Sequence, residues 1–395
     1  MQSVADALRA VIARVSAMPT EPVALEAACG RVVASDIVAR RALPGFDNSA
    51  MDGYAARSRE LPATLPIARI VGAGDQSREP VPAGHAVRIF TGAPMPAELD
   101  TVVMQEDVTL AGDRVVLPAA PPGDHLRRAG EDIAVGDLVI AAGTRLAPWH
   151  LGTLAALGFA EVAVARAPRV ALIATGDELV DVATTPGFGQ LVDSSMHALA
   201  ALVVEAGGIP AKLGIVGDRP DELRDRIAAA LDHDVVITTG GVSVGDRDHV
   251  HAALAAAGVT LELWKVAMKP GKPFSFGTRG TTGVFGLPGN PVSTIVAYEL
   301  FLRPALLAMQ GARVTARPRA QVQLAGGYRK QAGRTHYLRA WVKRTGDRLV
   351  ATPHGKQGSA MLSSLVGVNA LVEIAAELTE VAADAMVPAI LMEAV

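Results

Sequence analysis

The sequence has little of several features that would restrict its function at once. Only Cys29 is a cysteine among the 395 residues, which excludes an intrachain disulfide and a cysteine-based zinc cluster. The formal net charge at pH 7 is −3, so no general polyanion-binding surface is expected. We therefore predict that nucleic acid is not a partner.

No uncharged apolar run reaches the roughly 18 residues that a membrane span needs. Residues 1–18 have apolar positions at helical spacing, but Asp6, Arg9 and Arg14 interrupt them, so they lack the apolar centre of a signal peptide. We expect no membrane association and a cytoplasmic location.

Familiar nucleotide-binding and catalytic patterns are also absent. The sequence has no P-loop, and no Gly-x-Gly-x-x-Gly opens a helix after a strand. His249 and His251 lie two positions apart in a helical stretch and cannot share a helix face. No Ser/His/Asp arrangement can be recognised.

The pattern of predicted helices and strands changes along the chain, which predicts several domains. After Pro168, short apolar strands alternate with helices, a pattern typical of a largely parallel sheet covered by helices. Short β-like runs precede this region, and five more follow Arg313. We predict an α/β multidomain protein with four parts: an elongated helix-and-strand linker domain (1–41 with 126–166), a small β-rich domain inserted in the N-terminal region (42–125), a βαβ parallel-sheet domain (167–312) and a small C-terminal β-barrel or sandwich (313–395).

The stretch 235–296 repeats one arrangement three times, with an apolar strand, a glycine- or proline-rich loop, and then polar residues or a helix. In a parallel sheet such loops gather at the carboxyl edge, where ligands bind. Gly240 and Gly241 allow close approach of the backbone, and Pro291 after Asn290 suits a helix start that points its positive end at the ligand. Nearby cations and carboxylates suggest a phosphorylated ligand with a divalent metal, although solvated lysines at an ordinary loop edge are the alternative; these residues are Lys265, Lys269, Lys272, Asp246 and Asp248.

More carboxylates fall at the ends of neighbouring predicted strands. Asp177 and Glu178 follow one strand and Asp218 another, which places them at the same edge. Oxygen ligands of this kind suit magnesium. Taken singly, Asp177 and Asp218 are more typical of helix N-caps, so the metal interpretation depends on their convergence.

The loop 44–55 is a second candidate site. It contains Asp52 before Gly53 and is longer and more apolar than a simple hairpin requires, with a satisfied Asx turn as the alternative. Thr91 and Asp132 lie in similar turn motifs, which carry little information on their own.

Seven motifs occur in a fixed order: PGFDNSAMDGYA, RIFTGAPMPAELDTVVMQED, RRAGEDIAVGD, ATGDELV, TTGGVSVGDRD, KPGKPFSF and GLPGNPVS. Together they resemble the molybdopterin molybdenumtransferases, the MoeA family, and are similar also to the E domain of gephyrin. The resemblance covers nearly the whole chain, and it is looser after Arg313, where only the β texture and GRTHYLRA match.

The resemblance implies the last step of molybdenum cofactor synthesis. Adenylylated molybdopterin and molybdate are the substrates, the pyrophosphate link is cleaved, molybdenum is placed on the dithiolene, and AMP is released. It further implies Mg²⁺ as cofactor, other molybdenum cofactor biosynthesis proteins as partners, and a homodimer. In that dimer the site lies between the molybdopterin-binding βαβ domain of one subunit and the small β-rich domain of the other.

The same resemblance assigns roles by motif. Molybdate is a tetrahedral dianion, which suits Lys269, Lys272, Arg339 and the helix after Pro291. The residues expected in catalysis are Asp52, Thr91, Asp132 and Glu178, and the expected metal ligands are Glu178, Asp246 and Asp248. Those expected to bind substrate are Asp218, Gly240, Gly241, Ser243, Asp248, Lys265, Lys269, Lys272, Pro288, Pro291, Ser293 and Arg339.

One departure from the family pattern stands out. Where the family usually has Tyr-Asp-Ser-Asn, this chain has Val192-Asp193-Ser194-Ser195, a change that alters ligand contacts or marks a divergent paralogue. Two other functions stay open: the preceding adenylyl transfer, whose proteins resemble residues 168–312 alone, and a non-catalytic pterin-binding or scaffold role. Tungstate, with the same shape and charge, is an alternative to molybdate.

Overall fold

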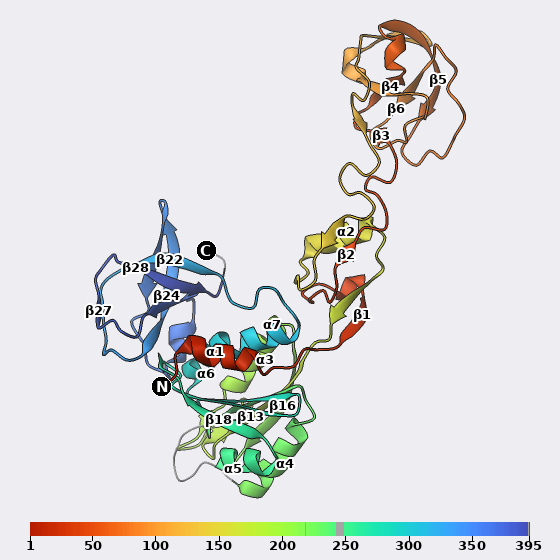
Figure 1. The fold of residues 1–395 in the computed structure, drawn as a ribbon. Helices are drawn as coiled ribbons and strands as arrows, with labels where there is room; N and C mark the ends of the chain where they lie inside the picture. Colours follow the sequence, from red (N-terminus) through yellow and green to blue (C-terminus); the bar gives the residue numbers. More distant parts are fainter. Residues whose placement is uncertain (218, 242–248, 394) are drawn as a thin grey trace.

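The computed structural model describes the chain except residues 218, 242–248 and 394, and for residues 262–264 it describes the backbone only. Figure 1 shows an elongated arrangement, in which the strands around β4 (Gly53–Ala56) and β6 (Ala86–Ile89) lie at one end, and the α/β unit and the C-terminal strands lie together at the other.

The α/β unit contains a six-stranded sheet with the order β16-β13-β17-β21-β20-β18. The first four strands of this order are parallel, as predicted, whereas β20 runs antiparallel to both of its neighbours, β21 and β18. The reversal at β20–β21 follows from the very short connection between these strands, because a parallel crossover needs a dozen residues or more. The strands are β13 (Arg169–Thr175), β16 (Ile209–Val216), β17 (Val235–Thr239), β18 (Thr260–Lys265), β20 (Pro273–Arg279) and β21 (Thr282–Leu287).

Helices cover both faces of this sheet, which explains why its strands are apolar along their whole length. On β17, Val235 and Ile237 join the core beneath α3 and the 291–309 helix, and Val236 joins the core beneath α4 and α5. The helices are α3 (Ser195–Glu205), α4 (Pro220–Ala230), α5 (His249–Ala256), and one continuous run of α6 (Pro291–Ala297), the π-helical η4 (Tyr298–Leu302) and α7 (Arg303–Met309).

The helix α1 (Val4–Ile12) lies in a different place from the one the sequence suggests. The predicted boundary grouped residues 1–41 with the linker domain. In the structure Ala7 and Val11 are fully buried in the core that contains α3, α6 and α7. The amphipathic pattern predicted the helix correctly, but it carries no information on which distant element receives the apolar face.

The linker unit is made from two distant segments. Strand β1 (Thr20–Ala24) pairs with β12 (Glu161–Ala165), and β2 (Ile37–Val38) pairs with β11 (Leu138–Ile140). The helix α2 (Pro148–Ala156) contributes Leu154 to the small core of this unit. These pairings bring the entry and exit of the inserted domain side by side.

The inserted domain contains six strands in the order β7-β4-β6-β5-β9-β8. A two-stranded pairing of β3 (Asn48–Ser49) with β10 (Leu126–Arg127) closes its base. The six strands are β4 (Gly53–Ala56), β5 (Ala63–Val71), β6 (Ala86–Ile89), β7 (Thr101–Met104), β8 (Thr109–Ala111) and β9 (Arg114–Leu117).

The C-terminal unit is a closed five-stranded barrel, because β24 pairs with both β25 and β26 and thereby completes a ring through β22 and β28. All five strands coincide with strand-like runs in the sequence: β22 (Arg319–Leu324), β24 (Thr335–Thr345), β25 (Arg348–Pro353), β26 (Ala370–Ile374) and β28 (Met386–Leu391). Outside the ring, β19 (Met268–Lys269) of the α/β unit pairs with β24 and sets Lys269 opposite His336. The lysine-containing loop is thus attached to the barrel. Two further short strands, β23 (Tyr328–Arg329) and β27 (Glu380–Val381), pair with each other.

The helix Pro291–Met309 is long and apolar enough to cross a membrane by length and composition, but 89% of an apolar 18-residue window of it is buried inside the protein. A buried helix of this kind is typical of the core of a folded domain.

Candidate functional site

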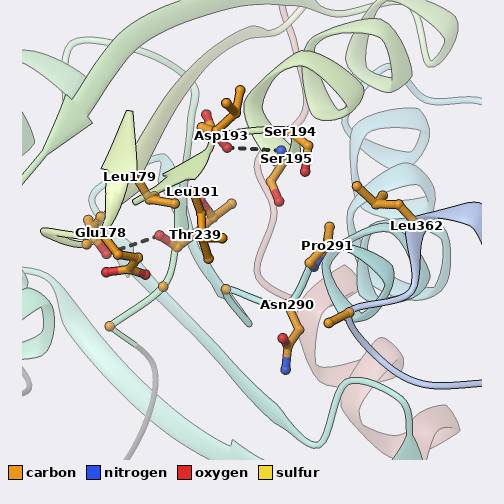
Figure 2. Close-up of a pocket in the computed structure, with 17 residues that line it drawn as sticks. Glu178, Leu179, Leu191, Asp193, Ser194, Ser195, Thr239, Asn290, Pro291 and Leu362 are labelled. Atoms are coloured by element: carbon orange, nitrogen blue, oxygen red, sulfur yellow. Dashed lines mark hydrogen bonds between the residues drawn. The ribbon is translucent and has the colours of Figure 1, made fainter. Parts of the chain in front are cut away.

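Three loops meet at the carboxyl edge of the parallel strands and line a cavity of about 680 Å³. They follow β13, β17 and β21, as the strand–loop pattern predicts. Ala360 and Leu362 of the C-terminal unit complete the wall, so the cavity lies between two units of the chain. Figure 2 shows Glu178 and Thr239 on one side of this space and Pro291 and Leu362 on the other.

The two glycines after β17 are required by the backbone. Gly240 and Gly241 have φ angles of +85° and +63°, which side chains rarely adopt. A Cβ atom at Gly240 would also lie 2.5 Å from the carbonyl oxygen of Thr175, and one at Gly241 would lie 2.2 Å from the Val250 side chain. The loop therefore passes close to the strand end, with its peptide groups at the cavity.

Glu178 carries the carboxylate that this cavity exposes most freely. Its side chain is solvent-exposed, and within the described part of the chain it makes no hydrogen bond or ion pair. Gly176 leaves space for it, since a Cβ atom at that position would lie 2.6 Å from a Glu178 oxygen. Glu178 is thus available to a ligand.

The run Val192–Ser195 forms another wall of the same cavity. Asp193 is buried, and its Oδ1 accepts hydrogen bonds from the backbone N–H groups of Ser195 (2.9 Å) and Met196 (3.3 Å), which caps α3. The aspartate shared with the family pattern therefore has a structural role in this chain. Val192 and Ser195, where the pattern changes, face the cavity.

A second cavity of about 550 Å³ adjoins the first, and Asn290 lines both. Figure 2 shows the Asn290 amide pointing away from Asp193 and Ser195. Three cations, and no carboxylate, are among its described lining residues, which also include neutral polar groups. The set is Lys269, Lys272, Arg334, Asn290, Ser293, Gln357 and Ser359, together with Met268, Pro270, Gly271, Pro273, Pro288 and Gly358.

One of the backbone N–H groups in the first turn of α6 already has a partner within the protein. Asn290 stands at the N-cap position, but its side chain accepts no capping hydrogen bond. The N–H of Val292 donates to the carbonyl oxygen of Ser359 at 3.1 Å. This contact joins the helix start to the loop of the barrel that lines the second cavity.

Several predicted residues cannot be placed in either cavity. Asp218, Ser243, Asp246 and Asp248 fall outside the described residues. Lys265 is exposed at the end of β18, and its described position is not in the lining of the two cavities.

The described residues contain no group of three or more histidine, cysteine, aspartate or glutamate side chains with the geometry to hold a metal ion. Magnesium, however, is usually held by one or two carboxylates with substrate phosphates and water, and the unengaged Glu178 carboxylate fits that requirement.

Asp52 and Thr91 are close to each other but belong to the inserted domain, at the far end of the chain from the sheet edge (Figure 1). Asp52 Oδ1 accepts hydrogen bonds from both the backbone N–H and the hydroxyl of Thr91, each at 2.8 Å. These two bonds lower the pKa of Asp52; desolvation opposes them, and the charge of Arg88 adds a weaker lowering. Asp132 is exposed in the connection to the linker unit. One chain does not bring Asp52 and Glu178 together.

Arg339 and Arg334 differ from what the sequence suggests. Arg339, expected to bind substrate, is 1% exposed and lines neither cavity, whereas Arg334, which the sequence analysis missed, lines the second. The wall 357–359 was missed as well. Its glycine- and serine-rich sequence, GKQGSA, was the available signal.

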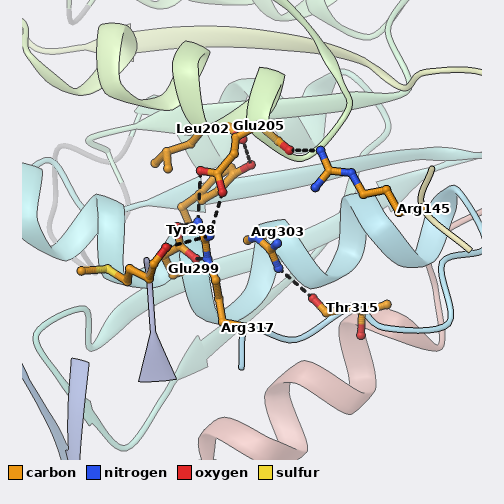
Figure 3. A network of polar contacts seen from close by, with 9 residues as sticks. Arg145, Leu202, Glu205, Tyr298, Glu299, Arg303, Thr315 and Arg317 are labelled. Atoms are coloured by element: carbon orange, nitrogen blue, oxygen red, sulfur yellow. Dashed lines mark hydrogen bonds and ion pairs between the residues drawn. The ribbon is translucent and has the colours of Figure 1, made fainter. Parts of the chain in front are cut away.

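A partly buried polar network behind the site joins the barrel to the α/β unit (Figure 3). The guanidinium of Arg317 forms two hydrogen bonds with the Glu299 carboxylate, at 2.9 and 3.0 Å, and an ion pair with Glu205 at 2.7 Å. The pKa of Arg317 is raised overall: burial lowers it, but the hydrogen bonds and ion pairs with the two glutamates together raise it by more. Arg145 of the linker unit reaches the same corner by donating to the backbone carbonyl of Glu205. Three units of the chain thus meet here.

Comparison with known families gives matches along nearly the whole chain. Residues 2–158 match the MoeA N-terminal region (domain I and II), residues 171–308 match the probable molybdopterin binding domain, and residues 321–392 match the MoeA C-terminal region (domain IV).

Individual proteins agree with this result. A molybdopterin molybdenumtransferase of Haemophilus influenzae is 38% identical over 92% of each chain. Molybdopterin molybdenumtransferase 2 of Mycobacterium tuberculosis is 36% identical over 97% of this chain and 98% of its own length. The crystal structure of a molybdopterin biosynthesis MoeA protein from Pyrococcus horikoshii superposes with a TM-score of 0.86 at 31% identity and covers 99% of this chain and 100% of its own. This chain therefore belongs to the MoeA family of molybdopterin molybdenumtransferases.

Proposed function

We propose that the chain inserts molybdenum from molybdate into adenylylated molybdopterin, cleaves the adenylyl pyrophosphate link and releases AMP. The observation that carries this proposal is the pair of cavities that meet at Asn290. One offers glycine-loop backbone and a free carboxylate, and the other offers three cations without a carboxylate. Two anionic substrates of different shape can thus bind side by side.

In the first cavity the loop at Gly240–Gly241 lies where the pyrophosphate link is expected, since close peptide N–H groups suit phosphate oxygens. Glu178 and the predicted ligands Asp246 and Asp248 would hold Mg²⁺, which supplies charge neutralisation of the phosphoanhydride. The residues of the chain would position the link for attack by an oxygen nucleophile. Val192 and Ser195 shape the wall next to the ligand.

In the second cavity Lys269 and Lys272 present exposed ammonium groups. Molybdate is a tetrahedral dianion, and charge-assisted hydrogen bonds to it are about twice as strong as neutral ones. Asn290 lies at the junction of the cavities, where the oxyanion and the bound pterin would approach each other. Tungstate would bind in the same way.

We further propose that the active form is a homodimer in the cytoplasm. The support is the separation of Asp52 and Thr91 from Glu178 within one chain (Figure 1). A second copy would supply Asp52, Thr91 and Asp132 to the sheet edge. The substrate and the product would be exchanged with other molybdenum cofactor biosynthesis proteins.

The test is single-turnover release of AMP from adenylylated molybdopterin with magnesium, with and without molybdate. We expect release that depends on molybdate, and its loss in Lys272→Gln. Lys343→Gln is the matched control, because Lys343 is an exposed lysine of β24 that lines neither cavity. Folded protein that binds the adenylylated pterin without releasing AMP would contradict the proposal and favour a non-catalytic paralogue.

A further inference from the structure

The guanidinium of Arg88, in strand β6 of the inserted domain, packs over two aromatic rings. Its Cζ atom lies 4.9 Å from the centre of the Tyr54 ring and 5.0 Å from the centre of the Phe90 ring. Tyr54 stands opposite Arg88 in the pairing of β4 with β6, and it is buried in the domain core. Such cation–π contacts restrict the plane of a guanidinium. The half-buried Arg88 side chain is therefore anchored to a fixed element of the domain.

The same guanidinium donates two hydrogen bonds beside Asp52. Nη1 donates to the backbone carbonyl of Gly53 at 3.2 Å, and Nη2 donates to the side-chain oxygen of Gln105. The backbone N–H of Gln105 in turn donates to the carbonyl oxygen of Asp52 at 3.1 Å. Arg88 and Gln105 together thus hold two consecutive backbone carbonyls, those of Asp52 and Gly53.

The backbone at Gly53 is restricted from the other side as well. A Cβ atom at this position would lie 2.0 Å from the carbonyl oxygen of Val103 in β7, so the chain passes very close to that strand. Asp52 therefore stands directly before a residue that is enclosed by β7 on one side and bound by Arg88 on the other.

Arg88 also reaches the surroundings of Thr91, which donates to Asp52 Oδ1 through its N–H and its hydroxyl. Phe90, whose ring packs on the guanidinium, directly precedes Thr91 in the chain. One side chain thus connects the residue after Asp52 with the residue before Thr91. In the described contacts Arg88 donates to neither Asp52 nor Thr91 itself, so it acts on the pair through their neighbours.

We propose that Arg88 is a positioning residue for the proposed reaction, because it fixes the backbone that presents the Asp52 carboxylate and the Thr91 donors. The inference rests on the proposed function, since it concerns the placement of residues expected in catalysis. A displacement of about 1 Å at a reacting group can lower a rate by about 100-fold, so slight loosening should be measurable. Arg88 lines neither cavity at the sheet edge, so molybdate binding should not depend on it.

The first test is amide hydrogen exchange of the full chain, compared between the unmodified protein and Arg88→Met. Methionine keeps an apolar chain beside the rings and removes the charge and both donors. The N–H groups of Gln105 and Thr91, which both donate to Asp52, should exchange faster, whereas exchange in the rest of the inserted domain should change little. Unchanged exchange at both N–H groups would overturn the proposal.

The second test is the pH dependence of single-turnover AMP release at saturating substrate. Arg88→Met should lower the rate about tenfold and move the acid limb to higher pH, because a looser Asp52 and the loss of a nearby positive charge both raise the pKa of its carboxyl. A smaller folded fraction would lower the rate without moving the limb. The affinity for molybdate, measured by calorimetry, should stay the same. Arg88→Lys keeps the charge without the paired donors, so it should recover only part of the rate.

Two further variants complete the design. Phe90→Leu keeps every hydrogen-bond donor and removes one ring contact, so it should cause the same changes on a smaller scale, and it keeps the proposal testable if Arg88→Met does not fold. Arg114→Gln is the matched control, since Arg114 is an exposed arginine of the same domain that donates to the carbonyl oxygen of Thr64. It should leave exchange, rate and acid limb unchanged. A lower rate in Arg88→Met with unchanged exchange and an unmoved limb would show that Arg88 contributes to stability alone.

The two measurements also separate this inference from the proposed function. If the unmodified protein releases no AMP, the proposed function fails, and the role of Arg88 in turnover fails with it. If the unmodified protein releases AMP in a molybdate-dependent way, but Arg88→Met leaves exchange, rate and acid limb unchanged, the inference is wrong and the proposed function stands.

Discussion

Two carboxylates expected in catalysis lie in opposite regions of the molecule, and their environments differ. Asp52 in the inserted domain is held by two hydrogen bonds from Thr91, and its pKa is lowered before any ligand arrives. The side chain of Glu178 at the sheet edge is exposed and makes no hydrogen bond or ion pair in the described part of the chain. The first is oriented by the protein, and the second is left for a ligand to orient.

The difference indicates how the work of one site is divided. An ionised, fixed carboxylate suits a group that must act at a set position, such as an acceptor of a proton or of a hydrogen bond from substrate. A free carboxylate suits a metal ligand, which adjusts when the ion and its phosphate partners bind. Neither region contains both, so the comparison predicts that two chains share the site.

The largest expected effect comes from removing either carboxylate. Asp52→Ala and Glu178→Ala should each lower single-turnover AMP release by at least about 100-fold, because each removes a polar group from the reacting centre. Neither should unfold the protein, since both side chains reach solvent. Near-normal rates in one variant would remove that residue from the site.

Mixing the two inactive variants tests whether the site is shared. After subunit exchange, half of the dimers contain one chain of each kind, and each has one intact site of two, so activity should recover to about a quarter of the unmodified level. Native mass spectrometry would verify the exchange. No recovery in verified heterodimers would show that the two carboxylates do not act across an interface. As a control, Asp52→Ala mixed with Thr91→Val should gain no activity over the average of the two separate variants, because both changes affect the inserted domain.

The sheet-edge half was largely predictable from sequence because its residues stand at strand ends. Alternating strands and helices fix which loops share an edge, so Glu178, Gly240 and Pro291 were placed together correctly. Gly240 and Gly241 could be predicted too, since glycines directly after a buried strand indicate a backbone conformation that excludes side chains.

The remainder depends on contacts that local pattern does not encode. Arg339 stands inside an apolar strand, and nothing in that strand shows that the segment 356–364 covers it. The packing of α1 against α3, α6 and α7 likewise joins segments almost 200 residues or more apart. The separation of Asp52 from Glu178 depends on where the inserted domain lies relative to the sheet edge, which local pattern does not encode.

The dependence of stability on pH should distinguish His336 of the barrel from Asp47 and Asp52 of the inserted domain. The folded pKa of His336, about 4, lies below its ordinary 6.5, so between these pH values the unfolded chain binds more protons than the folded one. The associated stability is complete above about pH 6.5 and is lost as pH falls towards 4, by at most about 3 kcal/mol. The lowered pKa values of Asp47 and Asp52 act differently, because their contribution is lost only below about 3.8.

The measurement is the free energy of unfolding by urea at intervals from pH 7 to pH 4, for the unmodified protein and His336→Gln. In this pH range the free energy of unfolding of the variant should change less with pH than that of the unmodified protein. His85→Gln is the control, since His85 is a half-buried histidine of the inserted domain, and it should leave the dependence unchanged. An equal slope in His336→Gln would mean that another group causes the acid sensitivity.

Thr91→Val should produce a smaller effect, confined to the inserted-domain half. It removes the hydroxyl donor and keeps the backbone N–H, so the rate should fall about tenfold and the pKa of Asp52 should rise. A higher pKa moves the acid limb of the pH–rate profile to higher pH, because the Asp52 carboxyl then ionises only at a higher pH. Thr91→Ser, which keeps the hydroxyl, should restore the profile. A lower rate with an unmoved acid limb would show that Thr91 acts in another way.

The smallest effect should come from returning Val192 and Ser195 to the family residues. Both line the cavity near Glu178, while Asp193 between them caps α3, so Val192→Tyr with Ser195→Asn should change the ligand wall and leave the helix intact. We expect the affinity for adenylylated molybdopterin to change less than about tenfold, as for the gain or loss of one or two neutral hydrogen bonds. The unfolding temperature should stay the same, whereas Asp193→Ala should cost about 1 kcal/mol as a lost cap. A gain well beyond tenfold would instead identify this run as the reason for weaker binding in a divergent paralogue, and it would make the free Glu178 side of the site, rather than the fixed Asp52 side, the one that limits the reaction.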